Sequence, residues 1–217
     1  MSEFPTTHAH LEVQALSCER GDRLLFQDLT FRVGAGETLL VEGANGSGKT
    51  TLLRTLCGLR APSSGRICWR GEDIGRIRPE FHADLNYIGH LPGIKDDLTA
   101  LENLRVACAL QGARANVDLM DVLDKVGLFG FEDLPCRHLS AGQRRRVALA
   151  RLWALDTRLW ILDEPFNAID RKGVDLLKGV LESHLATGGS IVLTTHQRIE
   201  VGQDRLQRLN LSDAEAL

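Results

Sequence analysis

Long hydrophobic runs are missing from this sequence. No apolar run approaches the ~20 residues that a membrane-spanning helix needs, so the chain is not expected to cross a membrane by itself. Residues 1–10 also lack the basic stretch and apolar core of a secretory signal. We therefore expect the chain to stay where it is made, in the cytoplasm or at the cytoplasmic side of a membrane.

An excess of positive charge and a paired-cysteine pattern are missing too. The net charge is -3, which does not favour bulk attraction to nucleic acid. The five cysteines are an odd number, are widely dispersed and include no C-x-x-C pair. This pattern favours buried free thiols over a metal or redox site, and it concerns Cys18, Cys57, Cys68, Cys108 and Cys136.

What is present is an ordinary globular composition. Hydrophobic residues make up 43% and charged residues 25% of 217 residues, a length at which one domain is simpler than two. We therefore treat residues 1–217 as a single domain. Alternation of apolar and polar residues over 11–33, around Gly21 and Asp22, predicts a hairpin or small antiparallel sheet.

The remaining pattern alternates strands and helices, which predicts a mainly parallel sheet with helices on its faces. Thr99 and Glu102 have the spacing of a capping box and open a helical region that extends to Val126. The predicted strands are 38–42, 66–70, 159–162 and 190–194, and the other predicted helices are 50–59, 144–155 and 172–185.

Residues 43–50, with the sequence GANGSGKT, satisfy the G-x-x-x-x-G-K-[ST] phosphate-loop pattern between a predicted strand and a predicted helix. Glycines let backbone N–H groups face phosphates, a lysine neutralises their charge, and a threonine hydroxyl can ligate Mg²⁺. A chance glycine-rich turn is the alternative. The predicted phosphate-binding residues are Asn45, Gly46, Ser47, Gly48, Lys49, Thr50 and Thr51.

Two carboxylates follow the apolar strand at 159–162, at the edge where a parallel sheet presents ligands. Asp163 is predicted to hold Mg²⁺, mostly through water. Glu164 is predicted to orient or deprotonate the water that attacks the terminal phosphate. Taken alone, an Asp-Glu-Pro sequence is equally consistent with a helix start.

Residues 139–143, with the sequence LSAGQ, precede an arginine-rich helix, and alone they indicate only a capped helix start that suits an anion. The order of phosphate loop, LSAGQ and Asp-Glu-Pro resembles the ABC transporter ATPase family over about residues 11–195. The resemblance implies an α/β fold: a P-loop NTPase core with a mainly parallel sheet, an antiparallel N-terminal β-subdomain and an α-helical signature subdomain at about 91–155.

The family resemblance also implies the rest of the site. Residues 167–170 match the D-loop, with Asp170 at the nucleotide, and His196 matches the switch histidine at the γ-phosphate. Without the resemblance, His196 would be a surface or capping residue. Catalytic roles fall to Glu164, His196 and Lys49. In an ATP-sandwich dimer with a second copy of the chain, one subunit's signature residues close on the ATP that the other holds, and these are Ser140, Gly142 and Gln143.

Two positions depart from the family pattern. His90 stands where the family has a glutamine that touches Mg²⁺, and an imidazole nitrogen suits that hard cation less well than an amide oxygen does. His90 is therefore either a weakened metal contact or one bridged by water. Arg20 stands where an aromatic residue commonly stacks on adenine, and a guanidinium plane can take that role.

Residues 87–95 and 98–104, together with the short length, resemble the haem-exporter ATPases of bacterial cytochrome c maturation. The resemblance implies transmembrane permease subunits of a haem-handling complex, a peripheral place at the cytoplasmic face of the inner membrane, and haem export or release of a haem-loaded chaperone. Another small ABC transporter and a soluble ABC ATPase of iron-sulfur assembly stay open as alternatives.

Nucleic acid is the less favoured partner. Repair and translation ATPases of this family carry a long coiled coil or a second ATPase domain, and neither is in this sequence. The arginines at 144, 145, 146 and 151 have no interleaved aromatic residues for stacking on bases.

Overall fold

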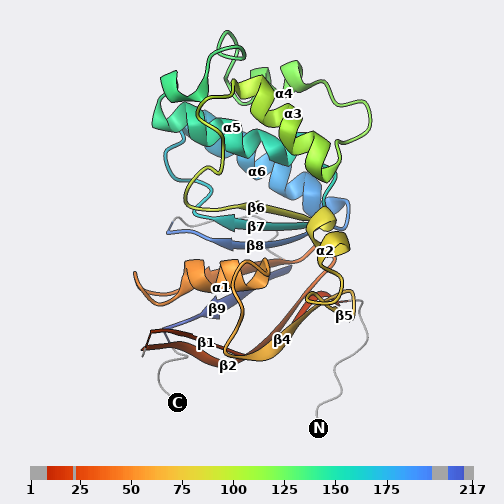
Figure 1. Ribbon diagram of the computed structural model, residues 1–217, viewed down its shortest axis with the longest axis vertical. Helices are drawn as coiled ribbons and strands as arrows, with labels where there is room; N and C mark the ends of the chain where they lie inside the picture. Colours follow the sequence, from red (N-terminus) through yellow and green to blue (C-terminus); the bar gives the residue numbers. More distant parts are fainter. Residues whose placement is uncertain (1–8, 22, 197–204, 213–217) are drawn as a thin grey trace.

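The computed structural model describes residues 9–21, 23–196 and 205–212, which form two sheets and a set of helices (Figure 1). The first sheet is antiparallel with the order β2-β1-β4-β5, and the second is parallel with the order β6-β7-β8-β3-β9. The first contains β1 (Ala9–Arg20), β2 (Arg23–Gly34), β4 (Ser64–Trp69) and β5 (Glu72–Asp73). The second contains β3 (Thr38–Glu42), β6 (Leu85–Ile88), β7 (Leu159–Asp163), β8 (Ser190–Thr194) and β9 (Leu206–Asn210).

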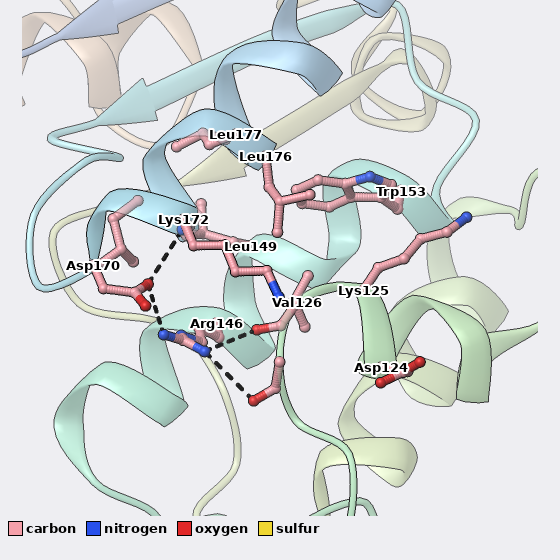
Figure 2. Close-up of a pocket in the computed structure, with 13 residues that line it drawn as sticks. Asp124, Lys125, Val126, Arg146, Leu149, Trp153, Asp170, Lys172, Leu176 and Leu177 are labelled. Atoms are coloured by element: carbon pink, nitrogen blue, oxygen red, sulfur yellow. Dashed lines mark hydrogen bonds and ion pairs between the residues drawn. The ribbon is translucent and has the colours of Figure 1, made fainter.

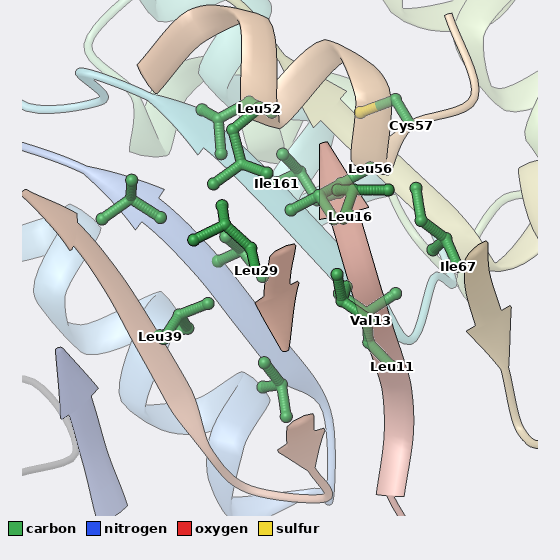
Figure 3. Close-up of a cluster of buried hydrophobic side chains, with 14 of the residues drawn as sticks. Leu11, Val13, Leu16, Leu29, Leu39, Leu52, Leu56, Cys57, Ile67 and Ile161 are labelled. Atoms are coloured by element: carbon green, nitrogen blue, oxygen red, sulfur yellow. The ribbon is translucent and has the colours of Figure 1, made fainter. Parts of the chain in front are cut away.

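Helix α1 (Lys49–Leu56) lies between the two sheets (Figure 1). Its buried leucines, among them Leu52 and Leu56, pack in one cluster with Leu16 of β1 and Ile161 of β7 (Figure 3). Burying a leucine stabilises a fold by ~1.5–3 kcal/mol, so this shared cluster fixes the phosphate loop relative to both sheets.

The other face of the parallel sheet is covered by α5 (Ala141–Ala154) and α6 (Arg171–Ala186). Trp160 of β7 is fully buried there and stacks on His184 of α6, with ring centroids 3.7 Å apart. Leu149 and Leu181 belong to the same cluster. Strand β7 is therefore covered on both faces, as its continuous apolar sequence predicts.

The helical region between β6 and β7 has a core of its own. Helices α3 (Ala100–Gln111) and α4 (Leu119–Lys125) pack against α5, with Leu104, Leu123 and Val147 among the buried residues. The predicted capping box is confirmed, because Thr99 Oγ1 accepts from the Glu102 N–H and the Glu102 carboxylate accepts from the Thr99 N–H. The elements within 91–155 are α3, α4, the 3-10 helix η1 (Cys136–His138) and α5.

The predicted fold class is confirmed, while several boundaries differ. The first predicted helix ends at Leu56 instead of residue 59, because Cys57 caps it and Gly58 takes φ 69°. The arginine-rich helix begins at Ala141, three residues earlier than predicted. Five short elements were not predicted, namely β5, α2 (Arg78–Asp84), β6, η1 and β9. Strand β5 has two residues and η1 has three, and the other elements lack the continuous apolar runs of the strands that were predicted.

All five cysteines are free thiols, as predicted; four are buried, while Cys108 is half-buried. Burial raises the pKa of the Cys57 thiol, which is fully enclosed in the core. No helix in the described ranges is both long and apolar enough to span a bilayer. The treatment of residues 1–217 as one domain stays a prediction.

Candidate active site

The site lies where the parallel strands end. Strand β3 leads into the phosphate loop, β7 ends at Asp163, β8 ends at Thr194, and β6 leads through Gly89 to His90. Because these strands run in parallel, their carboxyl ends meet at one edge of the sheet. Segments that are far apart in the sequence are thereby brought into one cleft.

The phosphate loop depends on glycine at its closest approaches. Gly43 has φ 145°, and a Cβ there would lie 2.6 Å from the hydroxyl oxygen of Ser47. Gly48 has φ 97°, and a Cβ there would lie 3.2 Å from Cβ of Leu25. A larger residue at either position would combine a strained backbone with a steric clash.

Helix α1 begins at this loop without a side-chain cap, since Gly48 is the N-cap residue. Its first N–H groups therefore need another acceptor, and together with the helix dipole they suit an anion. Lys49 Nζ donates to the carbonyls of Gly43 and Ala44, at 2.7 and 3.0 Å. The ammonium group thus lies over the loop that would hold the phosphates.

A chain of hydrogen bonds joins the phosphate loop to the carboxylates. Thr50 Oγ1 donates to Asp163 Oδ2 at 2.8 Å, and Thr194 Oγ1 donates to Asp163 Oδ1 at 2.8 Å. The Thr194 hydroxyl also accepts from the Glu164 N–H at 2.9 Å. Asp163 is 3% exposed, so both of its oxygens are held in place by buried or half-buried donors.

Glu164 has a left-handed backbone with φ 50°, a conformation that costs ~1–3 kcal/mol for a residue other than glycine. Within the described part of the chain, neither of its carboxylate oxygens accepts a hydrogen bond, although the residue is only 9% exposed. His196 Nε2 lies 3.2 Å from Glu164 Oε1. The carboxylate is thus available to accept a proton or a hydrogen bond from a bound water.

Arg145 of α5 is buried behind these residues. Its guanidinium donates to the carbonyls of Gly89, Asp163 and Glu164, at 2.7, 2.9 and 2.9 Å. Burial lowers the pKa of Arg145, while the nearby Asp163 and Glu164 carboxylates raise it. This arginine is therefore an internal link between α5, β6 and β7.

A cleft of about 360 Å³ opens over these groups and brings together most of the predicted site residues. It is lined by Arg20 and Leu25 from the β1-β2 hairpin and by His90 after β6. The other lining residues are Asn45, Gly46, Gly48, Lys49, Thr50, Thr51, Asp163, Glu164, Asn167 and His196. Ser47 is 6% exposed and lies beneath the loop against Gly43.

The signature residues do not line this cleft in the single chain. Ser140 caps α5: its hydroxyl accepts from the Gln143 N–H at 3.2 Å, and the Gln143 side chain accepts from the Ser140 N–H at 2.9 Å. A Cβ at Gly142 would lie 3.2 Å from the carbonyl oxygen of Ala168, so the signature turn packs closely on the D-loop. Their predicted contact with ATP requires another chain.

Asp170 also lies outside the cleft in the single chain. It caps α6 by accepting from the Gly173 N–H, and it pairs with Arg146 at 2.8 Å. Figure 2 shows Arg146 between Asp170 and the carbonyls of Val126 and Gly127. The neighbouring cavity of about 290 Å³ contains no phosphate-loop residue, and the predicted role of Asp170 at a nucleotide stays a prediction.

The donor set at the phosphate loop fits Mg²⁺. The Thr50 hydroxyl and the Asp163 carboxylate are oxygen ligands, which this cation prefers, and they lie 2.8 Å apart. Within the described ranges, no group of three or more His, Cys, Asp or Glu residues could hold a metal ion. The pair therefore suits a cation that takes its remaining ligands from phosphate oxygens and water. His90 lines the same cleft but offers nitrogen.

Sequence reasoning missed several residues of the site. Thr194 and Arg145 make their contacts only across the sheet edge, and no local pattern identifies them. Leu25 faces the cleft from β2. Asn167 belongs to the D-loop match and lines the cleft, so that motif could have added it to the predicted set.

Comparisons with known proteins agree with this geometry. A family model described as ABC transporter matches residues 26–167. The chain therefore belongs to the ABC transporter family, and it is an ATP-binding ATPase of that family.

Two relatives show which branch of the family the chain resembles. It is 50% identical over 213 residues to the cytochrome c biogenesis ATP-binding export protein CcmA of Nitrosomonas europaea, covering 98% of this chain and 100% of that protein. It is 47% identical over 206 residues to the protein of that name in Escherichia coli K12, covering 95% of this chain and 98% of that protein. The resemblance drawn from residues 87–95 and 98–104 is confirmed.

Solved structures show the same fold. An ATP-binding subunit of an ABC transporter matches with a TM-score of 0.82 and 27% identity over 93% of this chain and 86% of that chain. A dimeric ATP-binding cassette in a post-hydrolysis state, bound to ADP and Pi, matches with a TM-score of 0.78 and 21% identity over 92% of this chain and 94% of that chain.

Three of the four arginines that prompted a nucleic-acid alternative make contacts inside the chain. Arg145 and Arg146 bond as described above, and Arg151 donates to the side-chain oxygen of Gln111 at 3.1 Å. Burial lowers the pKa of Arg151 as well. These three guanidinium groups form no free basic surface for phosphates.

Proposed function

We propose that this ATPase hydrolyses Mg²⁺-ATP in the cleft over the phosphate loop, with Glu164 as the base for the attacking water. The observation that carries this proposal is the chain of hydrogen bonds from Thr50 through Asp163 and Thr194 to the Glu164 N–H. It links the group that would meet the cation to the group that would meet the water.

In the proposed reaction a water oxygen bonds to the γ-phosphorus, and the bond to the β,γ-bridging oxygen breaks. ADP leaves with the bonding electron pair, and the water's proton passes to the Glu164 carboxylate and then to solvent, which gives ADP, phosphate and a proton. Lys49 and the N–H groups of α1 stabilise charge on the phosphate oxygens. Mg²⁺ held by Thr50 and Asp163 supplies charge neutralisation at those oxygens when bound.

We place His196 at the γ-phosphate. Its Nε2 lies 3.2 Å from Glu164 Oε1, and its side chain is 61% exposed and lines the cleft. An imidazole there can donate to a phosphate oxygen while it stays next to the catalytic carboxylate. Arg20, at the far wall of the same cleft, is assigned to the adenine ring.

The active form proposed here is a head-to-tail dimer of this chain. The signature residues Ser140, Gly142 and Gln143 expose a helix N-terminus away from the chain's own cleft. A second copy that presents this turn would enclose the γ-phosphate from the open side. Binding of ATP would close such a dimer, and loss of the γ-phosphate would open it.

A membrane permease is the second proposed partner. A groove of about 240 Å³ with a mainly apolar lining lies between residues 93–95 and α3, directly after His90. Leu110, which lines this groove, is 80% exposed, and Leu91, directly after His90, is 74% exposed. An apolar cytoplasmic segment of the permease suits this groove. The chain would then be peripheral at the cytoplasmic face of the inner membrane.

Haem export, or release of a haem-loaded chaperone during cytochrome c assembly, is the proposed process. It is supported by identity of 47–50% to cytochrome c biogenesis export proteins over nearly the full length of both chains. The alternatives are another small ABC transporter and a soluble iron-sulfur assembly ATPase. Co-purification of this chain with its partners from cells distinguishes the iron-sulfur assembly ATPase from the two transporters, because exclusively soluble partners would contradict a permease.

The catalytic assignment is tested with Glu164→Gln. We expect ATP binding to persist, turnover to fall by about 10²–10³-fold, and ATP to trap a closed dimer that size-exclusion chromatography detects. Full steady-state turnover in this variant would remove Glu164 from catalysis.

The cellular role is tested with Lys49→Ala as the only copy of the protein. We expect loss of haem attachment to a periplasmic c-type cytochrome, with the chaperone held in its haem-loaded form, at normal levels of permease and variant. Normal holocytochrome would leave the ATPase assignment in place and refute the cytochrome c role.

A further inference from the structure

Arg145 makes more contacts to the active-site backbone than its place in an arginine-rich helix suggests. It is 5% exposed, and its two terminal nitrogens donate to three carbonyls that belong to two different strand ends. One carbonyl, that of Gly89, precedes His90 at the cleft wall. The other two belong to Asp163 and Glu164.

The contact to Glu164 matters because that residue has a strained backbone. Its φ of 50° persists only if the surroundings hold both sides of the residue. Thr194 Oγ1 accepts from its N–H, while Arg145 and the Asn167 N–H donate to its carbonyl, at 2.9, 2.9 and 3.2 Å. Arg145 is the one of these groups that also reaches the strand before His90.

We propose that Arg145 is a positioning residue for hydrolysis: it holds the Glu164 backbone in its left-handed conformation and ties it to the Gly89-His90 segment. Movement of that segment then changes the orientation of the Glu164 carboxylate. The inference rests on the role proposed above for Glu164.

The side chain fits this task for a geometric reason. A planar guanidinium carries several N–H donors in fixed directions, so it can hold carbonyls on two strands at once. The next residue, Arg146, contacts other groups: it pairs with Asp170 and donates to the carbonyls of Val126 and Gly127, away from the cleft. Removal of Arg145 should therefore affect the hydrolytic step, while the phosphate loop stays intact.

The test is a double-mutant cycle between Arg145→Gln and Glu164→Gln, with single-turnover hydrolysis of radiolabelled ATP as the readout. In the wild-type background we expect Arg145→Gln to lower the rate by about 10–100-fold and to leave the Kd for ATP within about twofold. In the Glu164→Gln background we expect no further loss, because Arg145 acts through the carboxylate. Arg105→Gln, at an exposed position of α3, is the control and should match the wild type.

A second variant covers the case in which Arg145→Gln does not fold. Arg145→Lys keeps the charge but loses the planar set of N–H donors, so we expect a smaller loss of hydrolysis rate than in Arg145→Gln. This loss should likewise vanish in the Glu164→Gln background.

The inference is wrong, while the role of Glu164 stands, if the rate losses of the Arg145 and Glu164 single variants multiply in a double variant. It is also wrong if Arg145→Gln hydrolyses ATP at the wild-type rate. If Glu164→Gln itself turns over normally, both are wrong.

Discussion

The hydroxyl of Thr194 provides the sharpest test of the active-site geometry. It donates to Asp163 Oδ1 and accepts from the Glu164 N–H, and all three residues are buried. Thr194→Val has nearly the same shape and removes only this hydroxyl. The variant would leave one carboxylate oxygen and one backbone N–H without these partners.

The expected cost follows from the two orphaned groups. Each unsatisfied buried donor or acceptor costs ~1–3 kcal/mol, so the two groups together should lower the free energy of unfolding by about 2–6 kcal/mol. For a chain of this size that corresponds to a decrease in Tm of roughly 4–24 °C. The Glu164 backbone would also lose one of the groups that hold its positive φ, so kcat should fall more than the affinity for ATP.

Thermal unfolding followed by circular dichroism, together with steady-state ATPase measurements, checks both expectations. Thr194→Ser is the matched control, because it keeps the hydroxyl and should cost only ~1 kcal/mol for the lost methyl group. The reasoning would be refuted if the free energy of unfolding of Thr194→Val lay within ~0.5 kcal/mol of the wild-type value. An equal loss of stability and of kcat in Thr194→Ser would refute it as well.

Two further predictions concern the cleft wall and the core. Arg20→Ala should weaken ATP binding by about 3–10-fold without changing the affinity for inorganic triphosphate, and an unchanged Kd for ATP in a fluorescence titration would remove Arg20 from the adenine site. Burial lowers the pKa of His184 from 6.5 to about 4, so the unfolded chain binds the extra proton and stability should fall as pH decreases from about 6.5 to about 4, by ~1.4 kcal/mol per pH unit. Urea unfolding of His184→Phe across that window should show a dependence of the free energy of unfolding on pH that is weaker by this amount. An unchanged dependence would mean that His184 does not cause the acid sensitivity.

The sequence alone was sufficient for features that depend on neighbouring residues. The phosphate loop is contiguous and lies between a strand and a helix, so its glycines and Lys49 could be identified directly. The capping box at Thr99 is likewise set by residues three positions apart. The hairpin of β1 and β2 followed from alternation on either side of Gly21.

The edges of the parallel sheet were harder to predict. Strand β6 has four residues and β9 has five, and each is defined by the strand beside it instead of by a pattern of its own. Strand β9 pairs with β3, more than 160 residues earlier in the chain, as the bond from Arg208 to Glu42 illustrates. Periodicity within a short window carries no information on such a pairing.

What the sequence by itself determined is therefore the kind of chemistry, because the phosphate loop and the Asp163-Glu164 pair are local arrangements whose residue types specify their use. Only the tertiary structure decided how the parts are connected. Thr50 meets Asp163 across 113 positions of the chain, and Arg145 crosses from α5 to two strand ends. The physical reason is that the order of strands in the sheet, and not distance along the chain, determines which buried donors and acceptors can satisfy one another.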